Sequence, residues 1–225
     1  LMPLLYALPE KFKERVDDEG RKVPQINVTM GYPLRNTLAY SFVERLLELQ
    51  KHARRDATTG AESFYYVDVE GLLTHPYVAT ASTSEYANLR SEIVKHRLFQ
   101  VPQSKVAVSP LLSLIFRKVG DWKSCSNYLL EVVDALIRGG EEGAECAFRT
   151  EFLAAVSEAL NKLQNIVAQC GIDLPEKIYH SLVRCHLQAE RVPFTGEPLQ
   201  GLQIMGILET RNLDFKNVII LSMTD

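Results

Sequence analysis

Two tripeptides in the sequence have the residue types and spacing of a metal-dependent nuclease site. They are Asp121-Trp122-Lys123 and Asp214-Phe215-Lys216. In one large class of nucleases a carboxylate holds Mg²⁺, and a lysine two positions later steadies the phosphate that is attacked. Neither tripeptide has an evident strand-borne aspartate for the second metal ligand, and so short a pattern is expected by chance in a charged chain. We therefore predict no catalytic residue in this chain.

Cysteines, histidines and clustered acids also lack the spacing of a metal site. The four cysteines are far apart and are expected to fill helix cores as small apolar groups: Cys125, Cys146, Cys170 and Cys185. The five histidines include no pair four residues apart: His52, His75, His96, His180 and His186. The acidic run 17–20 is typical of a solvated loop. No metal site is predicted.

The charge balance limits what the chain could bind unaided. It has 25 Lys and Arg against 28 Asp and Glu, a net charge of -3, which is not the field of an autonomous nucleic-acid binder. The basic stretch 51–56 could meet phosphate, but a solvated helix end explains it better. No ATP-binding GxxxxGK[ST] loop is present. No apolar run approaches the ~20 residues that span a bilayer, so we expect a soluble, cytoplasmic protein without membrane contact.

The period of the apolar residues predicts a mostly helical middle, from about residue 36 to residue 191. The expected helices begin near Asn36, Val69, Ser82, Pro110, Asp121, Phe148 and Asp173. Asp68 is a candidate N-cap for the second, and Ser82 with Glu85 forms a capping box for the third. The last helix is expected to pack through Ile178, Leu182 and Cys185.

Strands are expected near both ends of the chain. Ile26 to Met30 alternates in polarity, Gly31-Tyr32-Pro33 is expected to turn the chain, and residues 64–67 form a possible short strand. Residues 202–207 resemble a strand, and 218–221 have the pattern of a strand buried on both faces of a parallel sheet. This layout predicts a helical insertion in a larger α/β domain, and we expect the chain to be a piece of a longer polypeptide.

The segment 201–221 resembles motif V of the UvrD/Rep-type superfamily 1 helicases. In that family a strand ending in Met-Thr-x-His leads to Lys-Gly-Leu-Glu-Phe and then to an apolar strand. The matching positions, two of them conservative, are Met205, Arg211, Leu213, Asp214 and Phe215. The positions that depart from the family pattern, where it has Thr, His and Gly, are Gly206, Leu208 and Asn212. Because those family positions help to couple ATP to DNA, the departures imply a motor-like domain without motor activity.

This variant is similar to the helicase-like, AddB-type subunits of bacterial recombination nucleases, which are inactivated helicases with a PD-(D/E)XK nuclease at the far C-terminus. The segment 26–34 resembles the entry to their inserted 2B domain. The resemblance implies an α+β, mostly α fold. Residues 25–195 would be a helical 2B-like domain, flanked by RecA-like 2A segments at 1–24 and 196–225. ATP, Mg²⁺ and any iron-sulfur cluster would belong to domains outside this chain.

The function implied is therefore a non-catalytic, helicase-like part of a DNA-repair helicase–nuclease subunit. Its expected partners are DNA and the partner subunit of the complex. Thr210 and Arg211 are the candidates for DNA contact, because a cation and a hydroxyl beside a strand end suit phosphate. Arg211 could equally pair with Glu209 or Asp214. The alternatives are a helical protein–protein interaction module without DNA contact and, third, a Mg²⁺-dependent nuclease.

Overall fold

The chain divides into two compact units in a computed structural model. One unit is Pro33–Val192, and the other combines Leu1–Tyr32 with Pro193–Asp225. The fold is α+β and mostly α. The structure describes residues 14–16, 22–24, 26–28, 31–57, 60–79, 89, 91–92, 95, 98–139, 144–192, 202–206, 214 and 216–220, with only the backbone for 14–16, 22–24, 26–28 and 144–148.

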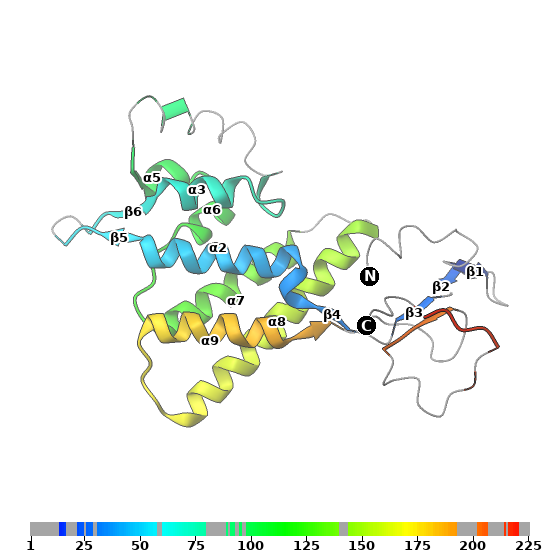
Figure 1. Ribbon diagram of the computed structural model, residues 1–225. Coiled ribbons are helices and arrows are strands. Elements are labelled where there is room, and N and C mark those ends of the chain that lie inside the picture. Colours follow the sequence, from blue (N-terminus) through cyan, green and yellow to red (C-terminus); the bar gives the residue numbers. More distant parts are fainter. Residues whose placement is uncertain are drawn as a thin grey trace. The chain divides into compact units, whose positions relative to one another are not determined.

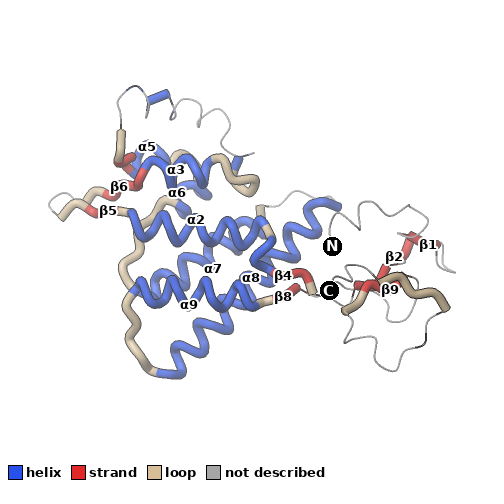
Figure 2. Tube along the Cα trace, viewed as in Figure 1, coloured by secondary structure: helices blue, strands red, loops and turns tan. Residues whose placement is uncertain are grey.

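The unit from Pro33 to Val192 is built mainly of helices (Figure 1, Figure 2). Helix α7 packs along α8, and α2 contacts α3, α8 and α9. The helices of the described residues are η2 (Leu34–Asn36), α2 (Leu38–His52), α3 (Tyr66–Leu73), α5 (Gln103–Val106), α6 (Pro110–Ile115), α7 (Trp122–Arg138), α8 (Ala144–Cys170) and α9 (Glu176–Ala189).

Side-chain caps fix where several of these helices begin. At the start of α2, Thr37 Oγ1 accepts a backbone N–H at 3.2 Å, and at the start of α6 Ser109 Oγ does so at 3.2 Å. At the start of α7, Asp121 Oδ1 accepts a backbone N–H at 2.9 Å. A cap of this kind stabilises a helix by about 1 kcal/mol. Helix α8 ends at Gly171, whose φ of +64° favours glycine. The starts predicted at Pro110 and Asp121, and the end predicted at Gly171, are confirmed.

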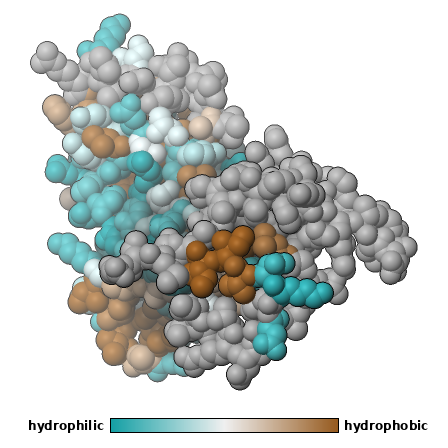
Figure 3. All heavy atoms as spheres, turned by 45° about the vertical axis from the view of Figure 1, so that its right-hand side comes forward, coloured by the Kyte–Doolittle hydropathy of each residue, from teal (hydrophilic) through white to brown (hydrophobic). Residues whose placement is uncertain are grey.

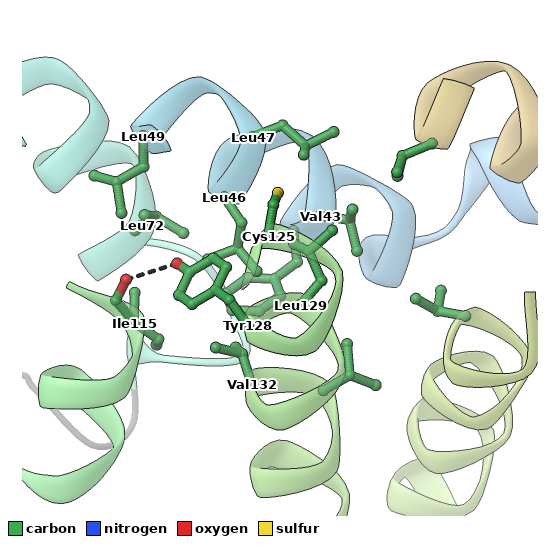
Figure 4. Packing of buried hydrophobic residues seen from close by; sticks show 14 of the residues in the cluster. Val43, Leu46, Leu47, Leu49, Leu72, Ile115, Cys125, Tyr128, Leu129 and Val132 are labelled. Atoms are coloured by element: carbon green, nitrogen blue, oxygen red, sulfur yellow. Dashed lines mark hydrogen bonds between the residues drawn. The ribbon is translucent and has the colours of Figure 1, made fainter. Parts of the chain in front are cut away.

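The core of this unit lies where α7 meets its neighbours (Figure 4). Leu129, Val132 and Cys125 of α7 are fully buried, as is Tyr128. The Tyr128 hydroxyl donates a 2.6 Å hydrogen bond to the backbone carbonyl of Ile115, at the end of α6. A buried hydroxyl must find such a partner, so this bond fixes α6 against α7.

A three-stranded antiparallel sheet stands beside α2 and α3. Its strands are β5 (Arg54–Arg55), β6 (Glu62–Tyr65) and β7 (Gln100–Pro102), in that order. The β5–β6 hairpin follows directly from the C-terminal end of α2 and extends away from it (Figure 1). Phe64 pairs with Val101, and both are fully buried. The sheet therefore turns one face to the core and the other to solvent.

The two ends of the helical unit lie side by side. Strand β4 (Tyr32–Pro33) pairs with β8 (Arg191–Val192). The backbone N–H of Leu34 donates to the carbonyl of Glu190 at 3.0 Å. The chain thus enters and leaves this unit at one place. The sequence predicts a turn at Tyr32-Pro33, which is wrong, because these residues form β4.

The second unit contains two pairs of short strands. β1 (Glu14–Val16) pairs with β2 (Lys22–Pro24) in antiparallel fashion. β3 (Ile26–Val28) pairs with β9 (Leu202–Ile204) in parallel, with Asn27 opposite Gln203. The strands predicted near 26–30 and 202–207 are thus present in part, and they are neighbours although far apart in the sequence.

The predicted buried face of α9 is wrong. Ile178 and Leu182 are 49% and 37% exposed, and Cys185 is exposed too. The helix buries Tyr179, Val183, Leu187 and His180 instead. Both sets of residues have helical spacing, and the set with the larger aromatic side chain is the one that packs against the core.

Three other predictions also need correction. Cys170 is exposed rather than a core filler. Among the cysteines whose side chains are described, only Cys125 fills the core, and the Cys146 side chain lies outside the described residues. Asp68 is no N-cap, because α3 begins two residues earlier at Tyr66. Residues 218–220 are exposed and form no strand, since no described segment pairs with them. Hydrophobic side chains accordingly reach the surface in patches among hydrophilic ones (Figure 3).

Candidate functional site

The motif-V-like segment begins at the end of the parallel strand pair. Met205 and Gly206 follow β9 directly and are partly buried. Parallel strands place their carboxyl ends at one edge of a sheet, which is where open α/β sheets bind ligands. Asp214 is exposed. The other predicted residues of this segment lie outside the described residues: Leu208, Thr210, Arg211, Asn212, Leu213 and Phe215. The Ser82/Glu85 capping box lies outside them too.

The Asp121-Trp122-Lys123 tripeptide is explained by helix capping. The Asp121 carboxylate accepts hydrogen bonds from the Ser124 backbone N–H at 2.9 Å and from its hydroxyl at 2.7 Å, and these bonds lower the pKa of Asp121. Lys123 Nζ lies 5.5 Å from the centre of the Trp122 ring. Among the described residues, no group of three or more His, Cys, Asp or Glu side chains is placed to hold a metal ion.

Cys125, His180 and Glu176 form an arrangement that resembles a cysteine nucleophile with its base. The Cys125 Sγ lies 3.5 Å from His180 Nε2, which lies 3.6 Å from a Glu176 carboxylate oxygen. Burial raises the pKa of the Cys125 thiol to about 12 and lowers the pKa of His180 to about 4. A nucleophilic cysteine needs the opposite shift and an accessible sulfur. The pair is therefore a neutral contact of the core, which the sequence spacing of 55 residues conceals.

Ser41 and His75 also lie within hydrogen-bonding distance, at 3.0 Å between Oγ and Nε2. Nδ1 of His75 accepts the backbone N–H of Tyr77 at 3.3 Å, so in the neutral ring the proton is on Nε2 and points to Ser41. The Ser41 hydroxyl donates to the carbonyl of Leu38 at 2.9 Å. Burial, with Arg45 nearby, lowers the pKa of His75 to about 4. The ring thus donates to Ser41 and cannot act as its base.

A charged cluster joins α2 to α9. Arg184 Nε lies 3.0 and 3.1 Å from the two oxygens of Glu44, and one of its terminal nitrogens lies 2.6 Å from Glu48. The Tyr40 hydroxyl donates to Glu44 at 2.6 Å. Every charged group of this cluster has a partner, so we assign it a structural role.

Beside the small sheet lies a series of aromatic rings that the sequence does not reveal as neighbours, of which Tyr65 stands on the face of the sheet opposite Phe64. Ring centres are 5.9 Å apart for His52 and Tyr65, 5.1 Å for Tyr65 and Tyr66, and 6.2 Å for Tyr66 and Phe99. Phe99 is 68% exposed. The exposed Arg54 of β5 comes from the basic stretch 51–56. The predicted helix end is correct only as far as His52, because Arg54 and Arg55 form β5. Sequence reasoning missed Phe99 because only the pairing of β6 with β7 brings it here.

No family model, no curated protein and no solved structure matches the chain. No helix in the described part of the chain is long and apolar enough to cross a membrane. The described surface of the helical unit offers aromatic rings for stacking and an exposed arginine beside the small sheet.

Proposed function

We propose that the chain is a non-catalytic, helicase-like part of a DNA-repair helicase–nuclease subunit. In this proposal the 2B-like insertion, which the sequence places at 25–195, corresponds to the helical unit at 33–192, and the strands on either side, including 26–28, belong to a 2A-like domain. The motif-V-like residues at and after Met205 would lie along DNA, with Arg211 and Thr210 toward the phosphates. ATP binding and nuclease chemistry would reside in other domains of the subunit.

One observation carries this proposal: the parallel pairing of β3 with β9. Residues 26–28 and 202–204 are neighbours in one sheet, while the unit between them is helical and has its own core. Parallel neighbours need a crossover connection, and here the crossover is an entire folded unit. An insertion in an α/β domain has this topology. The motif-V resemblance then selects the helicase-like family among α/β domains.

A crosslinking experiment tests the pairing. Asn27→Cys combined with Gln203→Cys places two thiols opposite each other in the observed register, so a disulfide between them should form on oxidation. Asn27→Cys combined with Ile204→Cys is the control, because successive side chains of a strand point to opposite faces. Mass spectrometry of the oxidised peptides separates the new disulfide from pairs involving native cysteines. Equal crosslinking of both variants would remove the basis of the proposal.

A salt titration tests the DNA contact. We expect a labelled forked DNA to bind the full chain at low salt and to dissociate steeply as salt rises. Arg211→Ala should reduce the slope of log Kd against log salt by about 0.7–0.9, the value for one lost phosphate contact. Arg138→Ala, which removes an exposed arginine of α7, is the matched control. Identical slopes for Arg211→Ala and Arg138→Ala would refute the assigned role of Arg211.

The exposed face of α9 favours a second candidate, a protein–protein interaction module without DNA contact. Ile178, Leu182 and Cys185 follow helical spacing and leave an apolar stripe open to solvent. The same DNA titration separates the two candidates. Negligible binding at low salt, with both DNA forks and single strands, would favour this second function.

A further inference from the structure

We propose that the solvent face of the β5–β6–β7 sheet is a stacking site for single-stranded nucleic acid. The site is far in sequence from Thr210 and Arg211 and does not depend on them. Only the choice of DNA as the probe rests on the proposed function. The proposal rests on three features of the described residues: which side chains share the face, how the rings are arranged, and which charges are free.

The strand register determines the composition of this face. Arg54 pairs with Ser63, Ser63 with Pro102, and Tyr65 with Gln100. Paired residues of antiparallel strands lie on the same face, and residues two apart along a strand do too. These five residues therefore share one face, while Phe64 and Val101 occupy the other and are fully buried. The sheet is anchored in the core, and on this face Arg54 and Pro102 are exposed while Ser63, Tyr65 and Gln100 are partly buried.

The aromatic rings extend this surface beyond the sheet. The rings of His52, Tyr65, Tyr66 and Phe99 form a continuous series in which each neighbouring pair meets edge to face, at 72–76° between ring planes. Tyr66 also packs partly on the core, and its N–H donates to the carbonyl of Phe99 at 3.2 Å. The series is thus held in place, and the Phe99 ring, at 68% exposed, offers a free surface to a base. Bases stack on such rings irrespective of sequence.

The charges beside the rings favour a phosphate backbone. Glu62 accepts the backbone N–H of Lys118 at 2.9 Å, and Asp68 lies 2.8 Å from His52 Nδ1. Among the described residues no carboxylate pairs with Arg54, which is exposed on the same face as Tyr65. The nearby acids are therefore engaged and one arginine is free to meet phosphate. A duplex hides its base faces, so only an unpaired strand can use the rings.

Fluorescence anisotropy with a labelled oligothymidylate of about 20 nucleotides tests this site on the full chain. Phe99→Ala should weaken binding about 5-fold or more, the loss expected for one stacked base, and leave the salt slope unchanged. Arg54→Ala should weaken binding and reduce the slope by about 0.7. Ile178→Ala and Lys177→Ala remove an exposed apolar side chain and an exposed cation of α9 and should leave the affinity unchanged.

Three results would overturn the proposal. The first is no binding of the oligothymidylate at low salt, and the second is an equal loss of affinity for Phe99→Ala and Ile178→Ala. The third is that a proline-rich peptide displaces the oligothymidylate while duplex and single-stranded DNA bind with the same affinity, which would make the face a peptide site. The outcome is distinguishable from failure of the motif-V contact. If Arg211→Ala weakens binding and Phe99→Ala does not, the sheet site fails while the proposed function stands. Circular dichroism melts confirm that each exposed-residue variant remains folded.

Discussion

Two buried histidines make the stability of the helical unit depend on pH. His75 and His180 are each 4% exposed. Burial is the main cause that lowers the pKa of both side chains from 6.5 to about 4. Arg45 and Arg149 add to the effect at His75. At His180, Arg184 and Lys51 also lower the pKa, while Glu48 opposes them.

The sign and size of the effect follow from proton linkage. A histidine with a folded pKa of about 4 binds its proton more readily in the unfolded chain, where the pKa is 6.5. Its contribution to stability is complete above pH 6.5 and decreases as the pH falls toward 4. At about pH 5.5 the expected loss is about 1.3 kcal/mol for each histidine and about 2.5 kcal/mol for both.

Urea unfolding at about pH 7.5 and about pH 5.5 measures this loss. The fluorescence of Trp122, the single tryptophan of the chain, is the probe, because it is buried with its ring 5.8 Å from Tyr179. His75→Gln and His180→Gln should each remove about half of the pH dependence, and the double variant nearly all of it. Comparing the two pH values within each variant cancels the cost of the substitution itself. A double variant that still loses as much stability as the parent would refute the reasoning.

Three further substitutions test the packing. Tyr128→Phe leaves a buried carbonyl without its 2.6 Å hydrogen bond, so the free energy of unfolding should fall by about 1–2 kcal/mol in urea titrations; no change would show that the bond is replaced. Gly171→Ala, at a φ of +64°, should lower the melting temperature through a cost of about 1 kcal/mol, whereas Gly120→Ala, with open space and an ordinary φ, should not. A double-mutant cycle on Arg184 and Glu44 should give a coupling free energy of about 0.5–1.5 kcal/mol. A value near zero would contradict a stabilising role for the charged cluster that joins α2 to α9.

Local signals predict several of the helix ends of this chain. Ser109 with Pro110, Asp121 and Gly171 mark helix ends in the sequence, and the structure uses them in those roles. Caps and a positive φ depend only on neighbours within one turn, so sequence alone can reveal them. Apolar period is less decisive, as α9 shows: it has two apolar faces, and only its packing against the rest of the unit decides which is buried.

Contacts between distant segments could not be predicted in the same way. Phe99 joins Tyr66 only because β7 pairs with β6, and Cys125 meets His180 only because α7 and α9 pack together. The sequence does suggest that both ends of the chain share a sheet, but it gives no register, and β3 with β9 supplies one. Register depends on which faces are buried, which is a property of the whole unit.

The adjacent ends of the helical unit explain how so distant a strand pair can form. If residues 29–201 were an unfolded loop, closing it would cost more than closing a short one, because the entropy cost rises with the logarithm of loop length. Pairing of β4 with β8, and the Leu34 to Glu190 hydrogen bond, bring the ends of the folded unit together. The effective connection is then roughly tenfold shorter, which favours the β3–β9 pair by about 2 kcal/mol. Folding of the helical unit therefore promotes the parallel pair on which the proposed function rests.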